Sequence, residues 1–333
     1  MNKILILKND RVGDLFHAIK GINSILNEHK DHEIEIVLSN FSKDLKFLFN
    51  INNTKTSILN YNLNLFEKLS IIKKIIFTKY EKIFILSPKN IYFYLPLISK
   101  SKFYAISVKD LKRDRPFNFL KKRLHKFKIN DRTNKKIFES IENLIEEISN
   151  ESLTNYPNLL NNDPPISNIL NKNLHLFDNF IHIHYKHSLF KKNGWSIKSF
   201  IDLSKKISIK TDKVFITSDY GNNNYNDEFL NSLSYINFDS GLSNIFNNSK
   251  IIYLHNIKIY DLFKVISLSD QVVSPHGTMS VMASYLKKKV IDLFDITISI
   301  NSFREFKPSN NEYNFLILKS ASDKVKNKII NFL

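Results

Sequence analysis

The sequence predicts an α/β protein made of two Rossmann-like halves, each built around a parallel sheet. Short apolar runs rich in β-branched residues alternate with helical patterns, which is typical of parallel strands joined by crossover helices. This alternation occurs twice, and a polar, aperiodic segment that contains Pro164 and Pro165 separates the two series. A chain of 333 residues is also long enough to bury two ordinary domain cores.

The first half, residues 1–150, contains four predicted strands with helices between or after them. The strands are expected at Ile4–Leu7, Ile34–Leu38, Ile83–Leu86 and Phe103–Ile106, and the helices at His17–Asn27, Ser42–Phe49 and Thr133–Ser149. Residues 151–173 lose the pattern and are predicted to be a linker.

The second half, residues 174–319, repeats the alternation. Strands are expected at Phe180–His184, Val214–Thr217, Ile251–Leu254, Gln271–Ser274 and Val290–Phe294, and helices at Ile197–Ile207, Ile259–Ser267 and Met279–Leu286. Sheets of this kind bind ligands beyond the carboxyl ends of their strands, and paired domains bind them in the cleft between.

Composition narrows the classes of function. The absence of cysteine excludes disulfides and thiolate chemistry and favours a reducing compartment, so we expect a cytoplasmic protein. No apolar leader segment and no 18-residue apolar run are apparent, so neither secretion by a signal peptide nor a membrane span is expected. The net charge of +17 attracts anions such as nucleic acid, anionic lipid or phosphorylated substrates. Its densest stretch, Lys109–Lys128, is interpreted as a solvated surface or as a surface for an anionic membrane or acceptor.

Two of the six glycines fall at switches from strand to helix. The first is Gly13, which we expect between the first strand and its helix, where a small residue allows a ligand to approach the backbone. Asp14 follows it at the carboxyl edge of the strand, where it is a candidate site residue or a cap of the helix.

The second switch lies in the stretch VVSPHGTMSVMASYLKKKVIDLF, from Val272 to Phe294. Its hydroxyls and the free N–H groups of a helix N-terminus suit a phosphate or diphosphate, although serine and threonine there also serve as caps. Neither switch has the GxGxxG or GxxxxGK[ST] pattern, which counts against a dinucleotide oxidoreductase and a P-loop NTPase.

Together with FIHIHYKHSLFKKNGWSIKSFIDLSKKI, from Phe180, these two segments resemble glycosyltransferase family 9, the bacterial heptosyltransferases of lipopolysaccharide core synthesis. The resemblance covers nearly the whole chain. It implies the GT-B fold, in which two Rossmann-like domains with parallel sheets face a central cleft, with an acceptor-side first domain and a nucleotide-sugar-binding second domain. It also implies that residues 320–333 form a terminal helix that packs back on the first domain.

The resemblance implies a role for each candidate residue. Asp14 is the expected general base, which takes the proton of the acceptor hydroxyl, and Arg11 and Gly13 flank it on the acceptor side. Helix N-termini and lysines are expected to stabilise the leaving nucleoside diphosphate, with neither a metal nor a cofactor. The donor-binding candidates are Lys186, Lys192, Ser218, Ser274, His276, Gly277, Thr278 and Ser280, and Lys186 is favoured over Lys192 because it lies closer to a strand end.

Departures from the family pattern occur at the donor side. Many members have Asp-Thr-Gly where this chain has His276-Gly277-Thr278, and a histidine where it has Val281. His276 is interpreted as a ribose or phosphate ligand, or as a cap. The alternating histidines of HIHYKH lack matching Asp, Glu or Cys ligands, so no zinc site is expected. Trp195 and Phe200 are expected in the core, and Ser218 and Asp219 fit a nucleotide contact or an ordinary turn.

The sequence therefore predicts an inverting, metal-independent glycosyltransferase. It would move a sugar, with heptose one candidate, from an ADP-sugar or other nucleoside-diphosphate sugar to a lipopolysaccharide core or other surface glycan, in peripheral contact with the anionic inner membrane. The alternatives are another donor for capsule or O-antigen, a degenerate sugar-nucleotide-binding protein, and a basic nucleic-acid-binding protein. The last lacks a recognisable binding motif, so nucleic acid is not expected as a partner.

Overall fold

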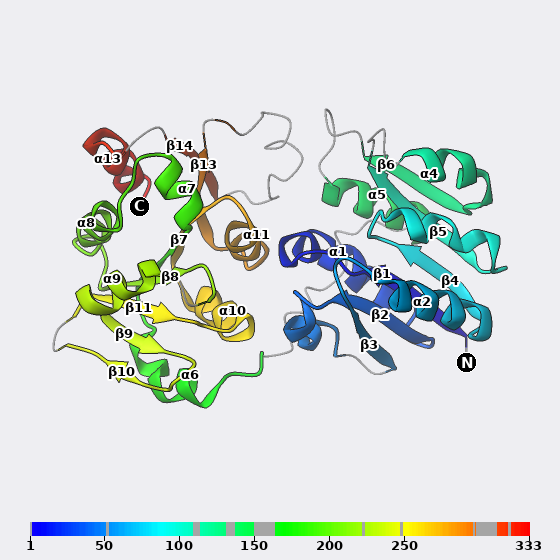
Figure 1. The fold of residues 1–333 in the computed structure, drawn as a ribbon, viewed down its shortest axis with the longest axis horizontal. Coiled ribbons are helices and arrows are strands. Elements are labelled where there is room, and N and C mark those ends of the chain that lie inside the picture. Colours follow the sequence, from blue (N-terminus) through cyan, green and yellow to red (C-terminus); the bar gives the residue numbers. More distant parts are fainter. Residues whose placement is uncertain are drawn as a thin grey trace. The chain divides into compact units, whose positions relative to one another are not determined.

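A six-stranded and an eight-stranded sheet organise the chain into two units in the computed structural model (Figure 1). The first unit comprises residues 1–163 and 299–307, and the second comprises residues 164–298 and 308–333. The structure describes residues 2–50, 53–108, 114–130, 137–149, 164–221, 224–246, 249–295, 297, 312–318 and 321–333. The predicted α/β class is confirmed.

The sheet of the first unit is parallel throughout and has the strand order β3-β2-β1-β4-β5-β6. Its strands are β1 (Lys3–Lys8), β2 (Glu33–Ser39), β3 (Thr54–Leu59), β4 (Tyr80–Ile85), β5 (Lys102–Val108) and β6 (Lys126–Asn130). The helices are α1 (Val12–Glu28), α2 (Leu65–Phe77), α3 (Asn90–Phe93), α4 (Asp114–Leu120) and α5 (Ile137–Ser149), with short 3-10 helices η1 (Lys43–Phe49), η2 (Leu95–Leu97) and η3 (Lys121–Arg123). Helices α2, α3 and α4 share one apolar core with Leu5 and Leu7 of β1.

All four strands predicted for this half are present. The helix expected at Ser42–Phe49 is the 3-10 helix η1, and the N-terminal part of the helix expected at Thr133–Ser149 lies outside the described residues. Strands β3 and β6 and helices α2, α3 and α4 were not predicted from the sequence. Strand β3 forms an edge and reads TKTSIL, so its polar alternation carries little apolar signal. Part of the basic stretch Lys109–Lys128 also lies outside the described residues, which resume at residue 114.

Gly21 is where α1 and α5 pack against each other. A Cβ built on Gly21 would lie 2.7 Å from Cγ2 of Ile141 and 2.6 Å from Cδ1 of Ile145, both of which are buried. Such distances are shorter than real carbon contacts, so any larger side chain forces the two helices to shift. The missing side chain therefore sets how closely the helices approach.

Gly21→Val is expected to lower the free energy of unfolding by about 1–3 kcal/mol, the usual cost of overpacking a core. Denaturant unfolding measures the change. The smaller Gly21→Ala should cost less than valine because one methyl group is easier to accommodate. Equal stability of the valine variant and the original protein would contradict this packing.

The sheet of the second unit has the order β10-β9-β11-β8-β7-β12-β13-β14, and only β10 is antiparallel to its neighbour. Its strands are β7 (Phe180–Tyr185), β8 (Lys213–Ser218), β9 (Ser234–Asn237), β10 (Ser243–Asn244), β11 (Ile251–His255), β12 (Gln271–Pro275), β13 (Lys289–Asp295) and β14 (Tyr313–Leu318). The helices are α6 (Asn168–Asn173), α7 (His187–Lys192), α8 (Ile197–Ile207), α9 (Asn224–Ser232), α10 (Ile259–Leu268), α11 (Thr278–Tyr285) and α13 (Asp323–Asn331), with the 3-10 helix η5 (Leu174–Leu176). All five strands and three helices predicted for this half are present, and β9, β10 and β14 were missed.

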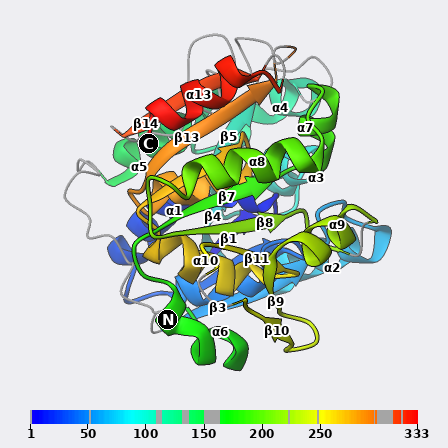
Figure 2. The ribbon, with the colours of Figure 1, turned by 90° about the vertical axis from the view of Figure 1, so that its left-hand side faces the viewer.

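Helices α8, α9 and α13 share a core with the central strands of this sheet. Trp195 and Phe200 lie in this core, as the sequence predicts. Figure 2 shows α8 and α13 on the near face of the sheet. Lys206 of α8 lies 3.0 Å from Asp323, and Ile329 of α13 is fully buried in the core.

The terminal helix, residues 320–333 in the sequence analysis, is thus part of the second unit, with α8 as its neighbour. The family resemblance implied packing on the first domain instead. An amphipathic helix has no sequence feature that specifies which of two similar sheets buries its apolar side. The end of the predicted linker, residues 151–173, is not a linker, because α6 occupies its last residues and belongs to the second unit. Residues 151–163 lie outside the described part of the chain.

Candidate functional site

The strand order of the first unit reverses between β1 and β4, and open parallel sheets bind ligands beyond the carboxyl ends of their strands at such a reversal. β1 is followed by Asn9, Asp10 and Arg11 and then by α1. β4 is followed by Leu86, Ser87 and Lys89. The first glycine segment of the sequence is therefore at the place where open parallel sheets bind ligands. Gly13 itself is the second residue of α1 and does not precede the helix, which corrects the predicted position.

A buried ion pair lies at this reversal of strand order. Lys8 is 1% exposed, and its Nζ donates to Oδ2 of Asp10 at 2.8 Å and to the Leu86 carbonyl at 3.2 Å. The Ser87 hydroxyl donates to the same Asp10 oxygen at 2.7 Å. These bonds join the two strand ends at the reversal. None of the three side chains was singled out from the sequence, although a lysine that ends an apolar strand signals a buried charge that needs a partner.

Asp14 lies half-buried in the first turn of α1. Burial raises the pKa of its carboxyl above the ordinary value of aspartate, and the nearby Asp10 adds to this, while Lys8 and Arg11 act in the opposite direction. The backbone N–H of Arg11 also acts to lower the pKa of this carboxyl. A partly desolvated carboxylate of raised pKa is the kind of group that serves as a general base.

The loop before α1 is held firmly. The Asn9 side chain is fully buried, donates to the Asn60 carbonyl at 3.1 Å and accepts from the Tyr92 hydroxyl at 2.7 Å. Arg11 is exposed, and its guanidinium lies 5.4 Å from the centre of the Tyr61 ring. Lys89 approaches the same ring, with its Nζ 4.7 Å from the centre. The Lys89 Nζ also donates to the carbonyls of Asn9, at 2.9 Å, and of Tyr61, so Lys89 holds this loop in place, whereas Arg11 is exposed.

The second unit has its own reversal of strand order, between β7 and β12. Most of the candidate donor-binding residues lie at or soon after the carboxyl ends of β7, β8 and β12, and Lys192 ends α7. Lys186 directly follows β7 and is exposed, and Ser218 ends β8. His276 and Gly277 follow β12. The structure thus gathers the predicted residues along one edge of one sheet.

His276 is held by a buried carboxylate. Its Nδ1 lies 2.6 Å from Oδ2 of Asp292, which is fully buried in β13. The Tyr313 hydroxyl donates to the same oxygen, and the imidazole stacks on Phe294 with ring centres 4.4 Å apart. Burial raises the pKa of the Asp292 carboxyl, while its hydrogen bond with His276 opposes that rise. The ring is therefore fixed through Nδ1. Sequence reasoning missed Asp292 and Tyr313, yet a single acid within the apolar run VIDLF was the available signal.

The turn after β12 leads into the N-terminus of α11. Gly277 is the N-cap, with φ of 154°, and a Cβ there would meet no atom within 4 Å. The space above the glycine is therefore open, and its backbone conformation is one that other residues rarely adopt. Thr278 begins the helix and is half-exposed. The Ser280 hydroxyl is buried and exchanges hydrogen bonds with the backbone of Gly277, at 3.2 and 3.0 Å. Ser274 is also buried and donates to the Pro275 carbonyl at 2.8 Å.

A second polar group lies along β7 and β8. The His184 ring contacts the Thr217 hydroxyl at 3.0 Å through Nδ1 and Asp219 at 3.7 Å through Nε2. Burial would raise the pKa of Asp219, but the hydrogen bond and charge of His184, together with Lys186, lower it overall. Asp219 is therefore an anion beside the exposed Lys186. Ser218 has its hydroxyl 2.6 Å from the Tyr253 hydroxyl, so it is engaged within the protein.

Lys192 closes α7 and lies 2.6 Å from Asp295 at the end of β13. It also donates to the Thr297 hydroxyl at 2.6 Å. Of the two candidate lysines, Lys192 is thus committed to a carboxylate, whereas Lys186 projects from the strand end. In the part of the chain that the structure describes, no group of three or more histidine, aspartate or glutamate side chains is placed to hold a metal ion.

His182, in the same strand as His184, is fully buried in the protein. Its Nε2 contacts the Thr217 hydroxyl at 2.9 Å, and burial lowers the pKa of its imidazole to about 3. It is therefore neutral and structural.

Among the described residues, no helix has the length and apolar character that a bilayer crossing needs.

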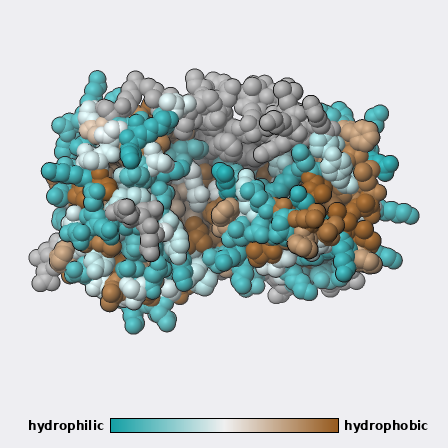
Figure 3. Space-filling model, in the orientation of Figure 1, coloured by the Kyte–Doolittle hydropathy of each residue, from teal (hydrophilic) through white to brown (hydrophobic). Residues whose placement is uncertain are grey.

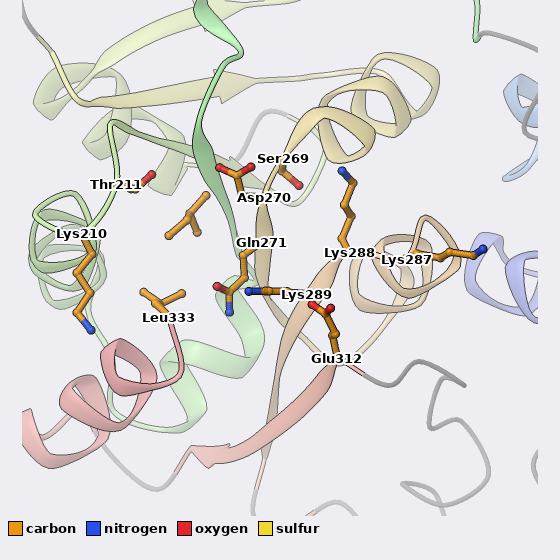
Figure 4. Close-up of a pocket in the computed structure, with 11 residues that line it drawn as sticks. Lys210, Thr211, Ser269, Asp270, Gln271, Lys287, Lys288, Lys289, Glu312 and Leu333 are labelled. Carbon is orange, nitrogen blue, oxygen red and sulfur yellow. The ribbon is translucent and has the colours of Figure 1, made fainter.

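A polar cavity of about 470 Å³ lies at the opposite, N-terminal edge of the second sheet (Figure 4). Gln271 and Lys289 begin β12 and β13 at its wall, and Lys210 and Thr211 precede β8. The cavity is thus separated by the length of the strands from the candidate donor residues. It forms no part of the candidate site.

Comparison with known proteins identifies the fold. No protein-family model matches the chain, and no curated protein matches its sequence. The structure is similar to that of the ADP-heptose lipopolysaccharide heptosyltransferase II of E. coli, with 12% identity, a TM-score of 0.67 and coverage of 99% of this chain and 97% of that one. It is similar to the E. coli heptosyltransferase WaaC with ADP, at 9% identity and a TM-score of 0.68, over 99% of this chain and 98% of that one.

A glycosyltransferase of family 9 from Veillonella parvula is similar over 95% of this chain and 86% of its own, at 12% identity and a TM-score of 0.63. UDP-N-acetylglucosamine 2-epimerases also match. At such identities the likeness is one of fold, and the fold accommodates more than one reaction on nucleotide sugars. The chain has the GT-B fold of the family 9 heptosyltransferases, as its sequence segments predict.

Proposed function

We propose that this protein is an inverting glycosyltransferase of the family 9 type, which transfers a sugar from a nucleoside-diphosphate donor to a lipopolysaccharide core or related surface glycan. Heptose with an ADP carrier is the first donor to test, because the similar solved structures include a heptosyltransferase with ADP. The observation that carries the proposal is Asp14, a half-buried carboxylate of raised pKa at the strand reversal of the first unit.

In this proposal Asp14 accepts the proton of an acceptor hydroxyl as that oxygen attacks the anomeric carbon of the donor. The bond between the sugar and the diphosphate breaks on the opposite side, which inverts the anomeric configuration. A sugar hydroxyl is a weak nucleophile near neutral pH, so a positioned base contributes about 10²–10⁴-fold. Arg11 is exposed and close enough to Asp14 to lower the pKa of that carboxyl, so it suits a phosphorylated acceptor.

The diphosphate is assigned to the turn of Gly277 and Thr278 at the start of α11. Free N–H groups and the helix dipole favour an anion there, and the open space above Gly277 allows close approach. His276 is assigned to the donor through Nε2, since Nδ1 is engaged by Asp292. Lys186 adds a charge from the end of β7. Ser274, Ser280, Ser218 and Lys192 have partners within the protein, and we assign them to shaping this edge.

The first test is a thermal-shift panel of ADP, UDP, GDP, CMP, NAD and a short DNA duplex. A ligand present at 100 times its dissociation constant stabilises the native state by about 2.7 kcal/mol. A selective shift by one nucleoside diphosphate is expected, and it names the donor series for transfer assays. A response to DNA without any response to a diphosphate would contradict the proposal. Conversion of a UDP-sugar without an acceptor would assign the protein to the epimerases instead.

His276→Ala is expected to weaken binding of that diphosphate by about 10–100-fold, the effect of losing one hydrogen bond to a charged group. Titration calorimetry measures it. His175→Ala, at an exposed histidine of η5, is the matched control and should bind as the original protein does. Equal affinities of the two variants would remove His276 from the donor site.

A further inference from the structure

The outward side of α2 is apolar. Five of its large side chains are exposed, and their exposed fractions are 66% for Leu65, 82% for Phe66, 53% for Leu69, 52% for Ile76 and 75% for Phe77. At 3.6 residues per turn they all fall within one arc of about 120°. Such an arrangement is a continuous stripe along the helix.

The opposite side of α2 is already packed on the sheet. Ile71 and Ile75 are 4% and 2% exposed and belong to the core shared with β1, β4 and β5. Because these residues account for the burial of α2 within its own unit, the outward stripe contributes nothing to that core. A helix that is apolar on both sides needs a second apolar partner for the outward one.

Further large apolar side chains project from the same layer of helices. They belong to the segment after α3 and to α4, where Tyr94 is 47% exposed, Leu97 is 48% and Phe119 is 80%. Since α2, α3 and α4 pack on the same face of the sheet, these side chains extend the stripe into a broader surface. Figure 3 shows hydrophobic side chains gathered on this face of the first unit. We call this set, with the stripe of α2, the apolar face.

The charges around the apolar face are mostly positive. Residues 61–102 contain eight lysines and two glutamates, with neither aspartate nor arginine. Lys73 lies within the stripe and is exposed, as are Lys79 and Lys100. Of the two acids, Glu67 is engaged in capping α2, where it accepts from the Asn64 backbone at 2.9 Å. The surroundings of the apolar face are therefore cationic.

The combination of exposed apolar side chains and surrounding lysines favours one kind of binding partner over another. A second copy of the chain would bring the same lysines against these, and like charges across an interface oppose association. An anionic bilayer offers an apolar interior for the phenylalanine and leucine side chains and negative headgroups for the lysines. We propose that the apolar face docks the protein on an anionic membrane surface, with α2 lying in the plane of the headgroups.

This inference deepens the proposed function, on which its biological purpose rests, because a lipopolysaccharide acceptor is itself anchored in a bilayer. The docking surface and the reacting carboxylate belong to the same unit, since α2 and Asp14 are both in the first unit. The membrane contact would therefore be made by the acceptor-side unit.

The test is co-sedimentation of the full chain with vesicles of phosphatidylcholine alone and of phosphatidylcholine with phosphatidylglycerol. The original protein should bind the anionic vesicles and lose binding as salt is added. The double variant Phe66→Ser with Phe77→Ser should bind them at least about tenfold more weakly, since it removes two inserting rings. The matched control is Ile209→Ser with Leu242→Ser, which removes side chains of 82% and 64% exposure from the second unit and should bind normally.

Three results would overturn the proposal. They are absence of binding by the original protein, equal binding by both double variants, and a dimer of the original protein that the Phe66 and Phe77 substitutions dissolve without changing vesicle binding. The nucleotide thermal shift is measured on the same variants and should be unaffected. Vesicle binding without any nucleotide shift would refute the proposed function alone, and a nucleotide shift without vesicle binding would refute the docking surface alone.

Discussion

Asp14→Asn is expected to lower the rate of sugar transfer by about 10²–10⁴-fold while nucleotide binding stays unchanged. Asparagine has nearly the same shape but cannot take up a proton, so only the base is lost. Transfer is measured as release of the nucleoside diphosphate in the presence of acceptor, and binding is measured by calorimetry. Asp44→Asn, at an exposed acid in the first turn of η1, is the control and should retain full activity. Unchanged transfer by the Asp14 variant would rule out this base.

The pH dependence of transfer gives the same hypothesis a second readout. A general base acts only when ionised, and burial raises the pKa of Asp14. The rate should therefore rise with pH through a midpoint above the ordinary aspartate value of 3.8. Stability changes in the opposite direction and falls as the pH rises. The folded state holds the proton of Asp14 more tightly than the unfolded chain does, so ionised Asp14 destabilises the fold at neutral pH. Asp14→Asn should thus be at least as stable as the original protein, which separates lost chemistry from lost structure.

Lys8→Met is expected to lower the free energy of unfolding by about 3–5 kcal/mol, because removing one partner leaves a buried charge uncompensated. Asp10 would keep only the Ser87 hydroxyl, and the bond from β1 to the Leu86 carbonyl would be lost. Denaturant unfolding measures the loss. Lys8 also lowers the pKa of Asp14, so the acid limb of the transfer rate should move to higher pH in this variant.

Lys3→Met is the matched control at the other end of the same strand. Its Nζ lies 3.1 Å from Glu33, but both side chains are more than a third exposed, and such pairs contribute about 0–1 kcal/mol. Should the Lys8 variant fail to fold, Asp10→Asn retains an acceptor for Lys8 and Ser87 and gives a milder measure of the same pair. Similar stability losses at Lys3 and Lys8 would show that burial of the pair has no special effect.

The sequence predicts the scaffold well because buried parallel strands have a strong apolar signal. Runs such as Ile4–Leu7 and Phe180–His184 correspond to β1 and β7, and the helix at Ile197–Ile207 is found with the same bounds. Strands β3 and β6 were missed because TKTSIL and KFKIN alternate polar and apolar residues and carry little of that signal, whereas β14 was missed although YNFLIL is apolar. The alternation also places both glycine segments where a strand passes into a helix, whereas the strand order that puts them at the reversals comes from the structure.

The partners of the site residues could not be predicted, because they come from distant parts of the chain. Ser87 reaches Asp10 across 77 positions, and Tyr313 reaches Asp292 only because β14 pairs with β13. A single sequence reveals that a buried acid needs a partner, but not which strand supplies it. The roles of Ser218 and Ser280 were undecidable for the same reason, as a hydroxyl at a strand end serves a ligand or its own backbone equally well.

The close approach of α1 and α5 at Gly21 has a consequence for how this protein can evolve. Gly21 and Asp14 are seven residues apart on one helix, which is two turns and about 10 Å along the axis. Any side chain in α5 that changes the spacing of the two helices therefore also displaces the carboxylate proposed as the base. Substitutions at Ile141 or Ile145 thus offer lineages of this protein a means to adjust the speed of the reaction while every residue that meets a substrate stays the same.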